Sequence, residues 1–396
     1  MNTRLNTFGT AGLLAVLAFV LYTSRISEPS RSADEAVLLG QAKVVASGDG
    51  GLQLFFRVND EHWLPPLAVY ATALISSVAP SDHAARIGTA AVGAVNVFLM
   101  FVLSRRLFPK PRVAVGAALL LIATPAHFVY ARAGVDAIYT LPFVLAWLIG
   151  VTDVLNGGPR WRAAVATCAL GVGVYAQPAG PLTMGFLLVI TLAAIWLSGR
   201  RDAGSFAVPV VAFLGPVAVA VVWLAAHPSA YPDTFGRWVI HAAHLRFPLD
   251  GLRAFVNWNT LGTRLSLYWG FLDPSWLFFD GAAGSTGALH GAAPFLFAVL
   301  ALLVSGISGR LRTGPAAVTL VLLAGLAVAP LAASTFGQPH AIGDALAVVP
   351  LVVVLAAGGL ADWFARDGGG WRLLGWAAVA AMAIDFAGFY VSYWSG

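Results

Sequence analysis

The chain has 396 residues, of which 59% are apolar and only 10% are charged, and its formal net charge is +5. About a quarter of the residues of a soluble globular domain are charged. The low charge and a mean hydropathy of +0.81 therefore exclude a soluble enzyme, a disordered chain and a fibrous protein. The single cysteine, Cys168, cannot form an internal disulfide. We expect a polytopic membrane protein.

Apolar stretches recur along the whole chain, and a helix needs about 20 predominantly apolar residues to cross a bilayer. We predict an all-α polytopic membrane protein with about 11 transmembrane helices, forming a single domain over residues 1–396. The stretches are Phe8–Tyr22, Arg86–Leu103, Val113–Tyr130, Ala137–Leu155, Trp161–Ala176, Pro181–Leu197, Phe206–Ala226, Gly291–Ile307, Pro315–Ser334, Ala341–Leu360 and Leu373–Tyr393.

The basic residues indicate the orientation of these helices. If the N-terminus is cytoplasmic, 13 of the 23 Lys and Arg residues fall in short inner segments, as the positive-inside rule requires. The net charge thus indicates membrane insertion, and we expect membrane lipids but no nucleic acid as partners. Two long loops, residues 23–85 and 227–290, then lie outside. Loops of this length are usually functional.

The first outer loop contains the acidic pair Asp34 and Glu35. It opens a predicted helix, Ala33–Ala46, and a second apolar helix is expected over Pro66–Val78. Both are too short to span the membrane and are expected to lie at its interface. Carboxylates in a first helical turn can simply cap the helix and favour its dipole. Alternatively, a carboxylate at the water–lipid boundary can accept a proton from a hydroxyl acceptor.

Two further polar segments lie on the same predicted face. Arg132 and Asp136 flank Gly134 in a tight outer turn, where they can be a structural pair with a helix cap or part of the site. Gly134 would let the backbone approach a ligand closely. His62 follows Asp60 and Glu61, but their spacing matches no established metal-ligand pattern. This segment can be an exposed loop, or His62 can contact an anionic group or the acceptor.

The second outer loop mixes basic and aromatic residues. Trp and Tyr favour the headgroup region, so an aromatic belt is one interpretation. A site for a lipid phosphate and a sugar ring is the other, because Arg binds phosphate in bidentate fashion. From this loop we select Arg264 and Trp269, and we add His340 at the mouth of the tenth predicted helix as a candidate phosphate contact. Other basic residues of the loop include Arg237, His241, His244, Arg246 and Arg253.

Several short motifs occur in a defined order. They are Asp34-Glu35, His62 to Leu67, Arg86-Ile87, Arg132 with Asp136, Tyr268 to Phe279, Ser285 to Gly287, and Pro339-His340 before a helix containing Pro350. In order and sidedness they resemble the GT-C superfamily of integral-membrane glycosyltransferases. The resemblance is to the bacterial relatives of dolichyl-phosphate-mannose protein mannosyltransferase and of lipid A aminoarabinose transferase.

This resemblance implies transfer of a sugar, with inversion, from a polyprenyl-phosphate donor to a protein, lipid or glycan acceptor. It implies a multi-pass protein of the bacterial inner membrane with its active site on the extracytoplasmic side. The catalytic first-loop carboxylate of the family maps to Asp34, and a second acidic residue maps to Asp136; Glu35 completes the catalytic set. His62, Arg132, Arg264, Trp269 and His340 form the substrate-binding set.

The sequence departs from the family pattern at two places, and it leaves alternatives open. Many relatives carry a basic residue near Gln177-Pro178, and others carry an Arg after the histidine of the tenth helix, where this chain has Gly343 and Asp344. A divalent metal is left open as a cofactor, with no metal ligand assigned. The alternative functions are a transporter or flippase for a lipid-linked or polar substrate, and a non-catalytic partner in glycan assembly.

Overall fold

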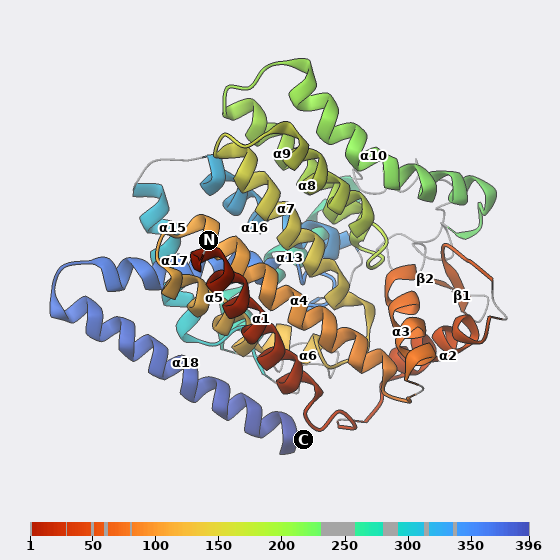
Figure 1. Cartoon of the computed structure of the whole chain (residues 1–396), viewed down its shortest axis with the longest axis horizontal. Coiled ribbons are helices and arrows are strands. Elements are labelled where there is room, and N and C mark those ends of the chain that lie inside the picture. Colours follow the sequence, from red (N-terminus) through yellow and green to blue (C-terminus); the bar gives the residue numbers. More distant parts are fainter. Residues whose placement is uncertain are drawn as a thin grey trace.

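A computed structural model describes residues 2–28, 30–48, 51–58, 62–79, 81–230, 258–279, 292–312, 317–335 and 339–395. Its elements are almost entirely helical (Figure 1). The helices are α1 (Asn2–Thr23), α2 (Ala33–Ser47), α3 (Pro66–Val78), α4 (Ala84–Leu107), α5 (Pro111–Ala123), α6 (Pro125–Tyr130), η1 (Asp136–Thr140), α7 (Leu141–Leu155), α8 (Arg160–Gly173), α9 (Gly180–Leu197), α10 (Ala203–Ala226), η3 (Trp258–Thr260), α13 (Leu261–Phe271), α14 (Pro274–Phe278), α15 (Ala298–Arg312), α16 (Ala317–Thr335), α17 (Val348–Ala365) and α18 (Gly369–Ser395).

The prediction of a helical, polytopic membrane protein is confirmed. Within the described residues, seven helices are long and apolar enough to cross a membrane. They are Ala84–Leu107, Asp136–Leu155, Gly180–Leu197, Ala203–Ala226, Ala317–Thr335, Val348–Ala365 and Gly369–Ser395, and the shorter apolar helices are Phe8–Thr23, Pro66–Val78 and Pro111–Ala123. A helix occurs in each of the eleven predicted stretches, although the exact number of membrane crossings is not fixed by these lengths.

Two of the predicted stretches differ from the observed helices. The stretch expected over Val113–Tyr130 is divided between α5 and α6. Pro125 is the first residue of α6, and its ring and missing N–H do not allow α5 to continue. The stretch expected to begin at Ala341 becomes α17 only at Val348, because residues 341–347 form a succession of turns.

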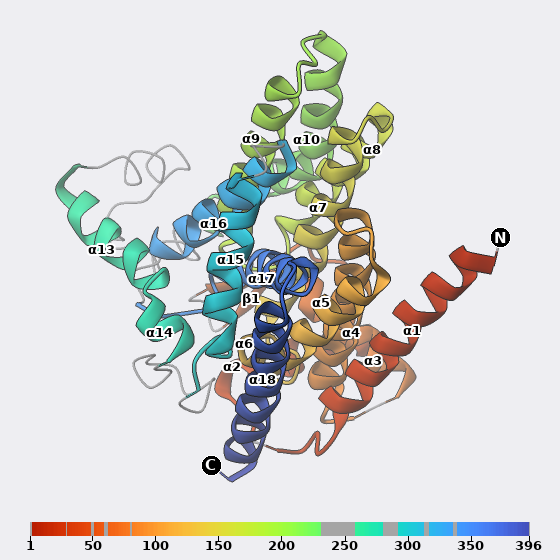
Figure 2. The same cartoon turned by 90° about the vertical axis from the view of Figure 1, so that its left-hand side faces the viewer.

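Helix α17 forms the centre of the bundle (Figure 2), with every residue from Val348 to Gly359 buried. Its closest neighbour is α15, and the two backbones meet at glycines. A Cβ atom at Gly306 would overlap the carbonyl oxygen of Leu355, and one at Gly359 would overlap the carbonyl oxygen of Leu302. Small residues at such crossings allow membrane helices to approach closely without a hydrophobic driving force between them.

We therefore expect Gly306→Ala to lower the thermal unfolding midpoint of the detergent-solubilised protein. The added methyl group meets backbone atoms, which cannot rotate away, so the cost should reach the upper part of the usual 1–3 kcal/mol for overpacking, about 3 kcal/mol. Gly116→Ala in α5 is the matched control, because its Cβ would meet nothing within 4 Å. Equal midpoints for the two variants would contradict this assignment of the crossing.

The first outer loop folds into a small unit at one end of the bundle, on the right of Figure 1. Its helices α2 and α3 agree with the predicted helices Ala33–Ala46 and Pro66–Val78. Between them lies a hairpin that the sequence analysis does not predict, with β1 (Phe56–Val58) antiparallel to β2 (His62–Leu64). Buried residues Ala42, Phe56, Val69 and Ala73 pack the three parts together.

Helix α18 lies on the periphery of the bundle (Figure 1) and carries the intramembrane carboxylate of Asp385. The backbone N–H of Phe297, just before α15, donates a hydrogen bond of 2.8 Å to Asp385 Oδ2. The first N–H groups of a helix have no partner within the helix, so this carboxylate caps α15 from a neighbouring helix. Asp385 thereby acquires a structural contact that joins α18 to α15.

Candidate functional site

Helix α2 begins at Ala33 in the first outer loop. The hydroxyl of Ser32 accepts a hydrogen bond of 3.1 Å from the backbone N–H of Glu35, so Ser32 is the cap of this helix. Asp34 therefore does not have to provide the cap. Its side chain is exposed, and the described residues offer it no ion pair. A carboxylate in the first turn of a helix is favoured by the helix dipole, and Asp34 lies at the surface.

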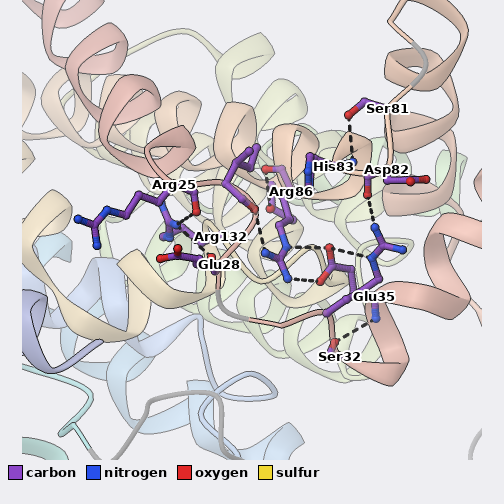
Figure 3. A network of polar contacts seen from close by, with 12 residues as sticks. Arg25, Glu28, Ser32, Glu35, Ser81, Asp82, His83, Arg86 and Arg132 are labelled. Atoms are coloured by element: carbon purple, nitrogen blue, oxygen red, sulfur yellow. Dashed lines mark hydrogen bonds and ion pairs between the residues drawn. The ribbon is translucent and has the colours of Figure 1, made fainter. Parts of the chain in front are cut away.

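Glu35 points into the protein and pairs with Arg86 at the start of α4 (Figure 3). Arg86 Nε and Nη2 donate to Glu35 Oε1 and Oε2, both at 2.8 Å, while Nη1 donates to the carbonyl oxygen of Ile26 at 2.8 Å. Only 1% of Glu35 and 4% of Arg86 are exposed. Both carboxylate oxygens are thus occupied by one guanidinium group, which fixes α2, and Asp34 beside it, on α4.

The outer turn between α6 and η1 packs directly on this ion pair. Gly134 adopts a left-handed backbone with φ of 65°. A Cβ at this position would lie 2.8 Å from Glu35 Cγ and 3.0 Å from Cδ. The close approach that the sequence analysis expects at Gly134 is therefore made to Glu35, and it brings the turn that precedes Asp136 against the start of α2.

Gly134→Ala should consequently destabilise the protein through both the backbone and the contact. The left-handed conformation costs a non-glycine residue about 1–2 kcal/mol, and the methyl group must also displace the Glu35 side chain. Gly157→Ala separates these effects, because Gly157 has φ of 90° but meets nothing within 4 Å. We expect a larger decrease in unfolding midpoint for Gly134→Ala, and the same decrease in both variants would show that Glu35 yields without cost.

Arg132 lies in the same turn but faces the backbone of the last turn of α1 and of the segment that follows it (Figure 3). Its Nη1 donates to the carbonyl oxygens of Tyr22 at 2.6 Å and of Leu21 at 3.3 Å. Its Nη2 donates to the carbonyl oxygens of Arg25 at 3.1 Å and of Glu28 at 3.3 Å. Its guanidinium carbon also lies 4.5 Å from the centre of a ring of Trp394 in α18. Arg132 thus joins three segments of the chain.

The carboxylates of Asp34 and Asp136, about a hundred residues apart in sequence, come together at this end of the bundle. The charges of Asp344 and Asp34 both act on the carboxyl group of Asp136. Asp344, in the turns before α17, is therefore a third member of the group, and burial raises its pKa to about 6. Within the described residues, no three His, Cys, Asp or Glu side chains converge closely enough to hold a metal ion.

Tyr130 at the end of α6 connects these carboxylates structurally. The charges of Asp344 and Asp136 act on its hydroxyl group, and the backbone N–H of Gly343 donates a hydrogen bond to it. A Cβ at Gly343 would lie 2.7 Å from the Tyr130 hydroxyl oxygen. The turns before α17 are thereby held against α6 and η1, with Asp344 beside Asp136.

His340 begins the same run of turns but faces α13 and α14. Its backbone is left-handed, with φ of 61°, a conformation that is uncommon outside glycine and tends to occur at functional sites. Its ring centre lies 4.9 Å from that of Trp276 in α14, and its charge acts on the Asp273 carboxyl group. Trp276 is 2% exposed, and its indole N–H has no hydrogen-bond acceptor among the described residues.

The two other selected residues of the second outer loop lie on α13. Arg264 is buried, whereas Trp269 is 63% exposed and packs edge-on against Tyr268 at a ring-centre distance of 5.2 Å. The Tyr268 hydroxyl donates to the carbonyl oxygen of Ala327 at 2.9 Å, which fastens α13 to α16. Outside the described residues are Arg237, His241, His244, Arg246 and Arg253 of the same loop, and the Ser285 to Gly287 motif.

His62 begins strand β2, opposite Val58; Asp60 and Glu61 before it lie outside the described residues. The hairpin contacts the outer end of α10 through aromatic rings. Trp63 lies edge-on to Trp223 at 5.0 Å, and Trp223 stacks on His227 at 4.4 Å. These contacts anchor the first outer loop on a second part of the bundle.

Sequence reasoning did not assign three residues that shape this site. Arg86 is recognised only as a residue opening a helix, Asp344 only as a departure from a family pattern, and Tyr130 not at all. A basic residue in the first turn of a helix is opposed by the helix dipole, and that position was the available signal that Arg86 has a carboxylate partner. Nothing local to Tyr130 or Asp344 indicates their proximity, which arises from packing of α6 against the turns before α17.

Comparison with known proteins identifies the fold. No family model and no curated protein matches the sequence. The structure is similar to that of ArnT from Cupriavidus metallidurans bound to undecaprenyl phosphate, with a TM-score of 0.63 and 15% identity over 97% of this chain and 76% of that chain. The apo state of the same protein gives a TM-score of 0.60 with 15% identity, covering 97% of this chain and 75% of that chain.

A more distant similarity is to the oligosaccharyltransferase of Archaeoglobus fulgidus tethered with an acceptor peptide. Its TM-score is 0.54 with 14% identity, and the similarity covers 98% of this chain but 54% of the archaeal protein. These proteins are GT-C glycosyltransferases. From the arrangement of its helices, the chain has the fold of the GT-C membrane glycosyltransferases.

Proposed function

We propose that this protein transfers a glycosyl group from a polyprenyl-phosphate-linked sugar to a protein, lipid or glycan acceptor, with inversion, at the extracytoplasmic face of a bacterial inner membrane. One observation carries the proposal: the exposed carboxylate of Asp34 lies within electrostatic reach of Asp136, on a fold shared with glycosyltransferases. The undecaprenyl phosphate bound to the similar ArnT structure supports a lipid-phosphate donor.

Asp34 is the proposed general base. The acceptor hydroxyl attacks the anomeric carbon of the sugar and gives its proton to the Asp34 carboxylate. The bond between that carbon and the phosphate oxygen breaks, and polyprenyl phosphate leaves as a stable anion. A single displacement of this kind inverts the anomeric configuration. Asp136 lies beside the base, and we propose that it binds and orients the acceptor or the sugar.

Glu35 and Arg132 have positioning roles in this proposal. Both oxygens of Glu35 are already bound by Arg86, so Glu35 holds α2 in place while Asp34 accepts the proton. The guanidinium group of Arg132 similarly donates hydrogen bonds to backbone carbonyl oxygens, and these bonds fix the turn before Asp136. Neither residue then has to contact the substrate directly.

The donor phosphate is proposed to bind at His340. The imidazole ring of His340 packs against the indole ring of Trp276 with the ring centres 4.9 Å apart, and the Trp276 N–H has no acceptor among the described residues. A phosphate oxygen would satisfy a buried donor that otherwise costs free energy. Arg264 and Trp269 of α13 and His62 of the hairpin are proposed as further contacts to the donor or acceptor.

The distribution of charge favours an interfacial enzyme over a transporter or flippase. Helix α4 runs from Arg86 at the carboxylate end to Arg105 and Arg106 at its other end, and its 24 residues span about 36 Å, enough to cross the bilayer. The positive-inside rule places that basic end in the cytoplasm. Transporters place their binding groups near the bilayer midplane, whereas Asp34, Asp136 and Asp344 gather at the opposite end.

The direct test is turnover of a lipid-linked donor by the purified protein. We expect release of undecaprenyl phosphate from undecaprenyl-phosphate-linked mannose, glucose or arabinose when a membrane extract supplies the acceptor. Mass spectrometry of the lipids measures this release. NMR of the product should show an inverted anomeric centre. Retention of configuration would contradict the single displacement, and movement of intact donor across proteoliposomes without its consumption would support a flippase instead.

A further inference from the structure

Residues 339–347 form a compact connection between the proposed phosphate site and the carboxylates. Backbone N–H groups of Asp344, Ala345 and Leu346 donate to the carbonyl oxygens three residues earlier, at 3.0, 3.1 and 3.4 Å. This pattern continues to Val348 and Val349, directly into α17. His340 stands at the start of this connection, and Asp344 follows four residues later.

The two ends present complementary chemistry. His340 faces Trp276 and Asp273, whereas Asp344 faces Asp136 and Tyr130. The carboxylate of Asp344 is partly buried, and the described residues provide no hydrogen-bond donor to it. An ionised carboxylate is an acceptor only, so a ligand hydroxyl can donate a hydrogen bond to it. A sugar joined to a phosphate carries hydroxyl donors at one end and phosphate oxygens at the other.

The position of Asp344 is fixed by its neighbours. Gly343 donates its backbone N–H to the Tyr130 hydroxyl, and there is no space for a Cβ atom at Gly343. On the other side, Ala345, Leu346 and Ala347 are buried in the core. A carboxylate held on a rigid element can discriminate between ligands, because a misplaced hydroxyl group leaves it without a partner.

We infer that Asp344 is a specificity-determining residue that accepts a hydrogen bond from a hydroxyl group of the donor sugar while His340 holds the phosphate. This inference rests on the proposed function and deepens it: the site recognises the sugar of the donor as well as its lipid phosphate. The residue that departs from the family pattern is then the one that selects the sugar.

The test compares binding of labelled undecaprenyl phosphate with binding of undecaprenyl-phosphate-linked mannose, glucose and arabinose to the full-length protein in nanodiscs. We expect the wild type to bind at least one glycosylated lipid about 10- to 100-fold more tightly than the bare lipid phosphate, the range for a hydrogen bond to a charged group. Asp344→Asn should lose this preference but keep its affinity for undecaprenyl phosphate. His340→Gln should weaken binding of both lipids.

Controls make the outcomes distinct. Asp367→Asn changes an exposed carboxylate beyond α17, at the other end of that helix, and should keep the preference. Unchanged unfolding midpoints establish that the variants are folded. If Asp344→Asn retains the sugar preference, or if the wild type has none, the inference is overturned while the proposed function stands. If the wild type binds neither kind of lipid, both are overturned.

The pH dependence gives a second readout. Because burial raises the pKa of Asp344 to about 6, its carboxylate is charged at pH 7.5 and largely neutral at pH 5. The groups facing it are Asp136 and Tyr130, and Asp34 faces Asp136 in turn. The sugar preference of the wild type should therefore decline as pH falls through about 6, whereas Asp344→Asn should bind with the same low preference at both pH values.

Discussion

Replacing Asp34 with Asn should abolish glycosyl transfer and leave the fold intact. A general base contributes about 10²- to 10⁴-fold to a rate, and an amide of the same size cannot accept the proton of the acceptor hydroxyl. The side chain of Asp34 is exposed, and Ser32 caps α2 without it. We therefore expect a loss of at least about 100-fold in turnover number with an unchanged unfolding midpoint, measured with a donor that the wild type consumes.

The matched control for this experiment is Glu28→Gln. Glu28 is an exposed acidic residue on the same face, and Arg132 contacts only its backbone carbonyl oxygen. This variant should transfer at the wild-type rate, which would show that loss of one negative charge from the face is not sufficient. Wild-type turnover by Asp34→Asn would remove Asp34 from the mechanism and direct attention to Asp136.

Replacing Arg86 with Gln should produce the opposite pattern, a large loss of stability. The change leaves the Glu35 carboxylate buried without its bidentate partner, and breaking a buried ion pair in this way costs about 3–5 kcal/mol. We expect a markedly lower unfolding midpoint in detergent, together with reduced transfer, because α2 and Asp34 lose their attachment to α4. The measurements are thermal unfolding of the purified variant and turnover at a temperature where it remains folded.

The double variant Arg86→Gln with Glu35→Gln distinguishes two costs. One is the cost of leaving the buried Glu35 carboxylate unpaired, and the other is the cost of losing the contact between the two side chains. With both charges removed, no carboxylate is left unpaired, so the double variant should be more stable than Arg86→Gln alone. A double-mutant cycle that also includes Glu35→Gln gives the coupling energy of the pair. A double variant no more stable than Arg86→Gln would mean that Arg86 acts mainly through its bond to Ile26.

The membrane helices could be predicted because apolar length is a property of a single segment. The predicted bounds of α3, Pro66–Val78, agree with those observed, since the proline pair Pro65-Pro66 marks where the helix begins. Breaks caused by tertiary context were missed. Pro125 lies inside an expected span and separates α5 from α6, and the two strands of the hairpin are three residues each, too short to show an alternating pattern.

Only those residues of the site whose role is indicated by the neighbouring sequence could be predicted. Asp34 and Asp136 stand out as carboxylates at helix starts on one predicted face, and the structure places them within electrostatic reach of each other. The partner of Glu35 could not be identified by spacing, because Arg86 is 51 residues away and the pairing depends on how α2 lies across α4. The same holds for Asp344, which reaches Asp136 only through the contact of Gly343 with Tyr130.

The contacts of Arg132 have a consequence for how this protein can diverge. Its hydrogen bonds to the last turn of α1 and to the segment that follows end on the carbonyl oxygens of Leu21, Tyr22, Arg25 and Glu28. Every amino acid carries that oxygen, so exposed positions such as Arg25 and Glu28 can change without loss of the anchor. Homologues can therefore keep the architecture of this corner while their residues there drift beyond recognition, and a search guided by side-chain identity would overlook it.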